Sequence, residues 1–247
     1  MSDWDRLFRL ALIYLLSGRS PYAIEGIFNP PWTFVVLVPA VWLPGLLPNL
    51  LPAAALIFAA YRKRKSYLIP IVGLSFPFVA LVFYANLDWL VLLGTLTQGS
   101  TSLFLLTTKP QAGALAFVAQ LKGKTWRQIM LMFAPLVALS LVFLALYPDW
   151  LQNTLVALND DQRIRNFSLF PYTVPLALPL LWRCYQRQDV LYGVLATLCL
   201  APYYYVHSYV PALFLIAERN WKLGLALSIL SWVVVLLIRQ GIIPLQL

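Results

Sequence analysis

Residues 100–121 read STSLFLLTTKPQAGALAFVAQL, a stretch apolar enough to lie in a bilayer that nevertheless carries Lys109, Pro110 and Gln111 near its middle. Burying an unpaired ammonium in hydrocarbon costs about 2.5 to 3.5 kcal/mol on insertion scales, so an intramembrane lysine usually faces a polar cavity and a partner. Proline removes a backbone donor and bends a helix, which opens carbonyl groups toward the same cavity. The stretch therefore predicts a kinked membrane span with a polar site at Lys109. The alternative is that Lys109 snorkels to the interface along its four-carbon stem.

The rest of the chain has the composition of an integral membrane protein. Hydrophobic residues make up 61% of the 247 residues and charged residues only 11%, against about 25% charged in globular domains. Apolar segments recur to the end without a long polar linker, so we predict one transmembrane domain over residues 1–247. Within it we expect an interfacial helix and loop at 1–30. Residues 31–247 should form an all-α polytopic bundle of roughly seven to nine hydrophobic helices, some short or re-entrant.

Positive charge is concentrated in short clusters between the apolar segments. The net charge is +9, but clusters of this kind are typical of juxtamembrane anchors, so we expect membrane lipids as partners and no nucleic acid. The strongest cytoplasmic marker is Arg62, Lys63, Arg64 and Lys65. Later basic residues should lie on the same side, namely Lys122, Lys124, Arg127, Arg183, Arg187, Arg219 and Lys222. Arg219 and Lys222 can lie on that side only if residues 190–217 form a hairpin of two short helices. The tip of this hairpin, APYYYVHSY, then faces outward.

The N-terminal segment predicts a helix lying in the membrane interface. Over residues 4–17 an apolar face alternates with one bearing Asp5, Arg6 and Arg9, and Gly18 is a natural stop. The apolar face comprises Trp4, Leu7, Phe8, Leu10, Ala11, Tyr14 and Leu15. The N-terminal segment carries Asp3 and Asp5 at positions where a signal peptide has basic residues. The side of this helix stays open: two crossings within residues 32–60 place it in the cytoplasm, whereas one kinked crossing places it outside with His207.

Soluble-enzyme motifs are absent from the sequence, which has no phosphate-binding glycine loop, HExxH motif, paired-cysteine metal pattern or nucleophile elbow. Cys184 and Cys199 fit ordinary packing positions. A mixed-charge loop carries Asp149, Asp160 and Asp161, which we interpret as solvated acids, although paired acids can also bind a divalent metal. We therefore expect no metal and no cofactor.

Several polar residues fall near the expected outer surface: Asp3, Asp5, Asp88, Lys109, Gln111, Tyr203, Tyr204, Tyr205 and His207. A carboxylate there could deprotonate an acceptor hydroxyl, while Lys109 and His207 could hold the phosphate of an activated lipid. Each residue has another interpretation. His207 also suits a tyrosine-rich interfacial belt. Asp88 could cap the short helix that it begins, or pair with Lys109 in place of a lipid phosphate.

Four pieces of sequence, in this order, carry a resemblance to a known superfamily: DW followed by LLSGRSPY and NPPW, then LDWLVLLG, KPQAG and PYYYVHSY. Together they resemble the GT-C superfamily of polytopic glycosyltransferases, most closely the family-87 type of polyprenyl-phosphate-mannose-dependent mannosyltransferase. In that family a transmembrane helix precedes the DW pair, and we expect a short form that lacks this helix. The resemblance implies that Asp3 is the general base and that Lys109 and His207 contact the donor phosphate. Gln111, Tyr204 and Asp88 then complete the expected substrate-binding set.

The expected function is therefore transfer of a sugar, with mannose the first choice, from a polyprenyl-phosphate donor to a lipid or glycan acceptor on the extracytoplasmic face. The expected location is the plasma (inner) membrane of a prokaryote. The alternative is a catalytically inactive relative that serves as a structural or lipid-binding subunit of a larger membrane complex, with other subunits as its partners. A small transporter is less well supported, because no inverted halves are visible.

Overall fold

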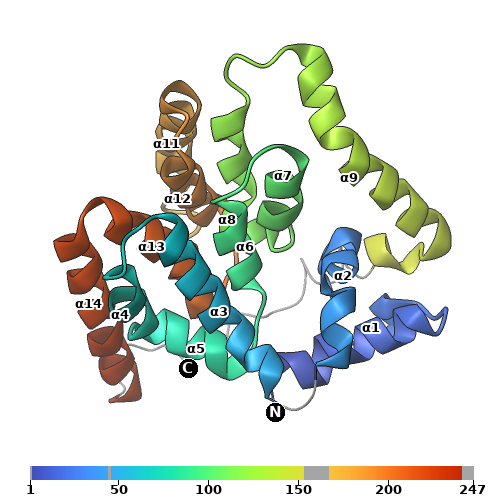
Figure 1. Ribbon diagram of the computed structural model, residues 1–247, viewed down its shortest axis with the longest axis horizontal. Coiled ribbons are helices and arrows are strands. Elements are labelled where there is room, and N and C mark those ends of the chain that lie inside the picture. The colour runs from blue at the N-terminus through green and yellow to red at the C-terminus, as the bar shows by residue number, and fades with distance from the viewer. Residues whose placement is uncertain (1, 44–45, 153–166, 241–247) are drawn as a thin grey trace.

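The computed structural model describes residues 2–43, 46–152 and 167–240, and all regular structure in these residues is helical (Figure 1). The α-helices are α1 (Arg9–Leu16), α2 (Pro31–Leu37), α3 (Leu47–Arg62), α4 (Leu68–Gly73), α5 (Phe76–Tyr84), α6 (Asp88–Gly94), α7 (Gly99–Thr107), α8 (Pro110–Gly113), α9 (Trp126–Leu146), α11 (Val174–Arg187), α12 (Val190–Leu200), α13 (Val210–Arg219) and α14 (Trp221–Arg239). Tighter or wider helical turns are η1 (Trp4–Phe8), η2 (Pro21–Ala23), η3 (Val38–Trp42), η4 (Ala114–Gln120) and η6 (Val206–Tyr209).

Few of these helices have the length of a membrane span. Among the described residues, α9 and α14 are long and apolar enough to cross a membrane. The number rises to four if two bent pairs of helices each count as one span. One pair joins α2–η3 to α3 and bends by 114°, and the other joins α5 to α6 and bends by 117°. This fits a helical membrane protein. It does not fit seven to nine membrane spans, even though some of the expected hydrophobic helices were short or re-entrant.

Prolines and helix caps explain the shortfall in spans. Residues 67–84 form an apolar stretch with the length of one crossing, but the stretch is split into α4 and α5 between Gly73 and Phe76. Ser75 caps α5 by accepting a hydrogen bond from the Phe78 amide, and Pro77 occupies the first turn. A proline is favoured in the first turn, where its missing N–H needs no partner, and is unfavourable in a helix interior. An apolar stretch can therefore be long enough for a span and still fold into two short helices.

The stretch at 100–121 is also divided, where a single kinked span was predicted. It forms α7, a break at Lys109, then α8 and η4. Lys109 is extended (φ −134°, ψ 83°), because Pro110 disfavours the helical conformation in the residue before it. The carbonyl of Thr108 is freed at this break and accepts hydrogen bonds from Asn29 Nδ2 (3.1 Å) and Thr33 Oγ1 (3.2 Å).

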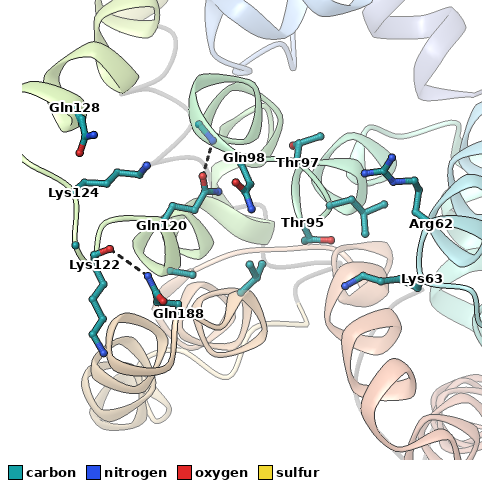
Figure 2. Close-up of a pocket in the computed structure, with 15 residues that line it drawn as sticks. Arg62, Lys63, Thr95, Thr97, Gln98, Gln120, Lys122, Lys124, Gln128 and Gln188 are labelled. Carbon is teal, nitrogen blue, oxygen red and sulfur yellow. Dashed lines mark hydrogen bonds between the residues drawn. The ribbon is translucent and has the colours of Figure 1, made fainter.

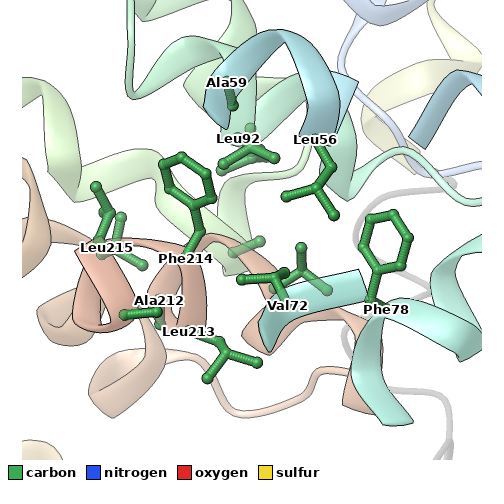
Figure 3. Packing of buried hydrophobic residues seen from close by; sticks show 14 of the residues in the cluster. Leu56, Ala59, Val72, Phe78, Leu92, Ala212, Leu213, Phe214 and Leu215 are labelled. Carbon is green, nitrogen blue, oxygen red and sulfur yellow. The ribbon is translucent and has the colours of Figure 1, made fainter. Parts of the chain in front are cut away.

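Two hydrophobic clusters hold the helices together. The larger cluster joins α3, α4, α5, α6, α12 and α13, and Figure 3 shows Phe214 of α13 among Leu92 of α6 and Val72 of α4. The smaller cluster ties η1 and α1 to α2, α6 and α9 through Trp4, Phe34 and Phe143. The site described below lies where segments from both clusters meet.

The N-terminal helix is amphipathic as predicted, with a shifted face. Trp4, Phe8 and Ala11 are buried, but Leu10 of the predicted face is exposed and Leu12 is buried instead. The shift follows from η1, which is a π-helix, since a π turn holds more residues than the α turn on which the prediction relied. Gly18 ends the helix with a φ of +74°, as expected.

The basic clusters meet at one end of the molecule. Lys63 forms an ion pair with Glu218 (Nζ to Oε1, 3.0 Å), which joins α3 to α13. Lys122 donates to the carbonyl of Gln186 (2.6 Å), and Arg219 pairs with Asp189. The turns before α9 and α12 lie in the upper part of Figure 1, and α1 lies in the lower part. The predicted hairpin of α12 and α13 has its tip at the end opposite the basic clusters.

Candidate functional site

Three ionisable side chains form a buried cluster. Lys109 Nζ lies 2.7 Å from Asp88 Oδ2, and His207 Nδ1 lies 2.7 Å from the same oxygen. The exposed fractions of the three side chains are 5%, 0% and 3% for Lys109, Asp88 and His207. Charges withdrawn from water in this way are tolerated only when they are paired and hydrogen-bonded. We name these residues the Asp88–Lys109–His207 cluster.

Each member of the cluster comes from an interruption in helical structure. Asp88 begins α6, just after the sharp corner at which Ala85 takes a left-handed conformation (φ 49°). Lys109 stands in the break before Pro110, and His207 lies in the short η6 turn after the extended tyrosine segment. In a continuous α-helix the backbone groups bond to one another, and the side chains project from all sides of the helix.

The proton positions in the cluster follow from the contact lengths. His207 Nδ1 is 2.7 Å from Asp88 Oδ2 and 3.2 Å from Lys109 Nζ. Because a carboxylate only accepts and an ammonium only donates, the shorter contact requires a proton on Nδ1, and the lysine contact is then not a hydrogen bond. Lys109 therefore donates to Asp88 and to Asn86 Oδ1 (2.9 Å). The ammonium is engaged by protein groups.

Asn86 extends this network to Asp3. Its Oδ1 also accepts from the Leu87 amide (2.7 Å), while its Nδ2 donates to Asp3 Oδ2 (2.8 Å). The other oxygen of Asp3 lies 3.5 Å from the Arg6 guanidinium. A hydrogen-bonded path thus runs from the buried cluster to a carboxylate near the surface. This path also places the N-terminal helix at the same end of the molecule as His207.

A pocket of about 920 Å³ opens beside this path. One part of its lining is polar, with Asp3, Arg6, Asn86, Lys109 and Gln111, and another part is aromatic. Arg6 has a side chain that is 64% exposed, so its charge is accessible from the pocket. The pocket therefore offers a carboxylate, a cation and aromatic surface to one ligand.

The structure brings together most of the residues singled out from the sequence. Asp3, Lys109 and Gln111 line the pocket, and Asp88 and His207 lie behind Lys109. Tyr204 lies apart from them, since its hydroxyl is 2.8 Å from that of Tyr209. Its neighbours Tyr203 and Tyr205 line the pocket instead, because alternate side chains of extended backbone point in opposite directions.

The sequence prediction missed Arg6 and Asn86 as pocket residues, and for the substrate-binding set it chose Tyr204 in place of Tyr203 and Tyr205. Arg6 carried a usable signal, because residues three apart on a helix share a face and Arg6 stands three residues after Asp3. Asn86 carried none, because its contacts with Asp3 and Lys109 join segments distant in the chain.

Three interpretations of single residues are corrected. Lys109 does not snorkel to an interface, since only 4% of the residue is exposed. Asp88 does not cap α6: the capping position is Leu87 and has no side-chain cap, and Asp88 binds Lys109 and His207. His207 is buried and bonded to Asp88, so it is not part of an interfacial belt.

No set of three or more His, Cys, Asp or Glu side chains within the described ranges could hold a metal ion. Asp149 accepts a hydrogen bond from Ser20 Oγ (2.6 Å). Asp160 and Asp161 lie outside the described residues.

Comparison with known proteins gives no match, whether with family models, with curated proteins or with solved structures. The function of the site therefore has to be inferred from its own chemistry.

Proposed function

We propose that this protein is a GT-C-like membrane glycosyltransferase that transfers a sugar, with mannose the first candidate, from a polyprenyl-phosphate donor to a lipid or glycan acceptor. The observation that supports this proposal is the position of Asp3. Its carboxylate is held by Asn86, stands beside the exposed Arg6, and lines a pocket with polar and aromatic surface. A base next to a cation, in a pocket that accommodates both a sugar and a phosphate, is what glycosyl transfer from a phosphate donor needs.

In the proposed reaction the acceptor hydroxyl attacks the anomeric carbon of the donor sugar, and Asp3 takes the hydroxyl proton. The bond between that carbon and the phosphate oxygen breaks, and its electron pair leaves with the polyprenyl phosphate. Arg6 stabilises the negative charge on the leaving phosphate, because a cation aimed at developing charge lowers the barrier. The reaction balances without a metal or another reactant.

The Asp88–Lys109–His207 cluster has a positioning role in this proposal. Lys109 was expected to contact the donor phosphate, but its ammonium already donates to Asp88 and Asn86. By binding Asn86 Oδ1, Lys109 orients the amide so that Nδ2 faces Asp3. Precise placement of a base requires such a supporting shell of hydrogen bonds.

The proposed site is extracytoplasmic, in the plasma membrane of a prokaryote, and the location of the pocket supports the extracytoplasmic side. It lies at the end opposite the basic clusters, which mark the cytoplasmic side under the positive-inside rule. The amphipathic N-terminal helix forms part of the pocket wall through Asp3, Arg6, Leu7 and Phe8. A helix lying in the interface is a suitable place to receive a donor whose lipid chain stays in the membrane.

The first test is Asp3→Asn in the purified full-length protein, assayed for sugar transfer from polyprenyl-phosphate mannose. Loss of the proton acceptor should reduce the rate roughly 100-fold or more, as expected for a general base. Donor binding, measured separately with a labelled donor, should persist, because Asn keeps the shape of the side chain and its hydrogen bond with Asn86.

The matched control is Asp5→Asn, which removes the same charge two residues further along the same helix. Asp5 bonds to Ser2 and does not line the pocket, so transfer should stay near the wild-type rate. Equal rates for the two variants would remove Asp3 as the base. Failure of the wild-type protein to bind any polyprenyl-phosphate sugar would end the proposal.

A second candidate, a non-catalytic lipid-binding or structural subunit, is favoured by α9. Of its residues only Met132 and Phe143 are buried, and Leu131, Leu141 and Leu146 are each more than 60% exposed. This apolar surface needs lipid or another membrane protein to cover it. Co-migration of a partner with the protein in mild detergent would favour this candidate, and stable purification alone would count against it.

A further inference from the structure

A second pocket lies at the basic end of the molecule, on the side opposite Asp3. Its volume is about 980 Å³. Figure 2 shows it between the end of α3, the turn from α6 to α7, and the segment that joins η4 to α9. Four of its residues are cationic, Arg62, Lys63, Lys122 and Lys124, and none of the described residues that line it is acidic. We name it the basic pocket.

The cations reach the basic pocket from opposite walls, and two of them keep their charges available. Lys63 pairs with Glu218, and the ammonium of Lys122 donates to the carbonyl of Gln186. The charged groups of Arg62 and Lys124 have no hydrogen-bond or ion-pair partner in the part of the chain that the structure describes. In Figure 2 Lys124 extends toward the space between the walls from one side, and Arg62 stands on the other.

The walls between these cations are already fixed by side-chain amides. Gln120 accepts from the Gly99 amide (2.7 Å) and donates to Ser102 Oγ (2.7 Å), which ties η4 to the start of α7. Gln188 donates to the carbonyl of Lys122 (3.2 Å). Gln128 closes a capping box with Thr125 at the start of α9. Because these walls are ordered in advance, a ligand would not need to order them on binding.

A plain juxtamembrane anchor would place its lysines and arginines on an open surface, each reaching lipid separately. Here residues more than fifty positions apart are folded around one recess, and two of its cationic groups, those of Arg62 and Lys124, have no partner among the described residues. Two positive charges facing a recess lined by amides and hydroxyls form a site for a phosphate, since phosphate accepts several charge-assisted hydrogen bonds.

We propose that the basic pocket binds a phosphate group, with Arg62 and Lys124 as its charged contacts and the adjacent amide side chains as further donors. The phosphate can come from the head group of an anionic membrane lipid or from a soluble phosphate ester, and both present the same chemistry. The proposal is independent of the transferase proposal, because the pocket lies at the other end of the molecule and shares no residue with the Asp3 pocket.

The test uses the full-length protein in a neutral detergent. Binding of short-chain phosphatidylglycerol and of short-chain phosphatidylcholine is measured by native mass spectrometry, with glycerol phosphate as a soluble competitor. The anionic lipid should bind roughly tenfold tighter than the zwitterionic one, since each basic residue near a lipid phosphate contributes about 1 kcal/mol. Displacement of the bound lipid by glycerol phosphate would identify soluble phosphate esters as ligands. If glycerol phosphate does not displace the lipid, the ligand is the lipid head group. Equal binding of the two lipids would overturn the proposal.

The decisive variant is Arg62→Gln with Lys124→Gln. It should bind phosphatidylglycerol roughly 10- to 30-fold more weakly than wild type, following the same charge contributions. The control is Arg183→Gln with Arg187→Gln, which removes the same charge from exposed positions of α11 outside the pocket, and its affinity should stay within about twofold of wild type. If the control loses as much affinity as the pocket variant, binding belongs to the whole basic end and the assignment to this pocket is wrong.

Discussion

At the residue scale, the carboxylate of Asp88 is the counter-charge on which the burial of Lys109 depends. It is fully buried, and the same oxygen serves both Lys109 and His207. A buried ion pair adds little net stability over a well-packed apolar pair, but removal of one partner leaves an uncompensated charge in a medium that cannot solvate it. The free energy of unfolding should therefore respond very differently to loss of one partner and loss of both.

We expect Asp88→Asn to destabilise the protein by about 3 to 5 kcal/mol, the usual effect of breaking a buried pair. The change preserves the shape of the side chain and removes only its charge, so the lost stability reports on the stranded ammonium. Thermal unfolding of the purified protein in mild detergent measures it. The double variant Asp88→Asn with Lys109→Met, which removes both charges, should recover part of the lost stability.

The control for this prediction is Glu218→Gln. It breaks the ion pair with Lys63, whose side chain is 32% exposed, and such partly exposed pairs contribute about 1 kcal/mol or less. If Asp88→Asn were as mild as Glu218→Gln, the cluster would not depend on the charge of Asp88.

At the element scale, α12 packs against η4 with almost no space between the two backbones. A Cβ on Gly193 would lie 2.5 Å from the Cα of Ala116 and 2.7 Å from the carbonyl oxygen of Leu115. The same two elements are joined by a hydrogen bond from the Leu115 amide to Thr197 Oγ1 (3.0 Å). The break at Lys109 is followed by α8 and then by η4. The contact between η4 and α12 therefore holds the segment that carries Lys109 in place.

Gly193→Ala should therefore destabilise the protein by about 1 to 3 kcal/mol or more, the range for overpacking, because the atoms in the way are backbone and cannot rotate aside. Gly73→Ala is the matched control. A Cβ there would lie 3.5 Å from a side-chain methyl of Leu56, an ordinary contact, and alanine is the better helix former. Unfolding temperatures that fall equally for both variants would show that the approach of α12 to η4 is not this close.

At the scale of the whole molecule, the fold separates two kinds of surface. The basic clusters meet at one end, while Asp3, Arg6 and the tip of the α12–α13 hairpin lie at the other. In a membrane the two ends should face opposite compartments, with the basic end in the cytoplasm.

Cysteine labelling with a membrane-impermeant maleimide tests this orientation. Arg6→Cys and Pro202→Cys should react from the same side of sealed vesicles, and Lys124→Cys only from the other. All three positions are exposed. Labelling of Arg6→Cys and Lys124→Cys from the same side would contradict the orientation, and with it the extracytoplasmic site.

The native cysteines need little engineering for this experiment. Cys199 is replaced by Ser, and Cys184 is retained because it is fully buried. Burial, reinforced by the nearby Asp189 carboxylate, raises the pKa of the Cys184 thiol to about 11. Since only the thiolate reacts with maleimide, roughly one Cys184 thiol in a thousand is reactive at pH 8, even before its burial is considered. Wild-type Cys184 should become labelled only after unfolding.

The coarse class of this protein and several residues of its site could be read from the sequence. Its apolar segments and basic clusters are local properties, so a helical membrane protein with its basic residues at one end could be predicted from them. The energetic demand of Lys109 is also local, because an intramembrane ammonium needs a partner wherever the chain folds. For this reason Asp88 could be named as a possible partner. Asp3, Gln111 and His207 could be named because they fall near the expected outer surface.

The positions of the helix breaks and the pairing of partners followed from the three-dimensional packing. Whether an apolar stretch is one span or two short helices depends on packing against neighbours as well as on proline, so the predicted number of spans was wrong. Three features depend on contacts between segments distant in sequence. Asp88, and not a lipid, is the partner of Lys109; Asn86 bridges Lys109 and Asp3; and Tyr203 and Tyr205 line the pocket in place of Tyr204. Residues 100–121 carry a lysine that requires a counter-charge. The fold supplies this charge because the helix ends and breaks that carry Asp88, Lys109 and His207 meet at one buried point.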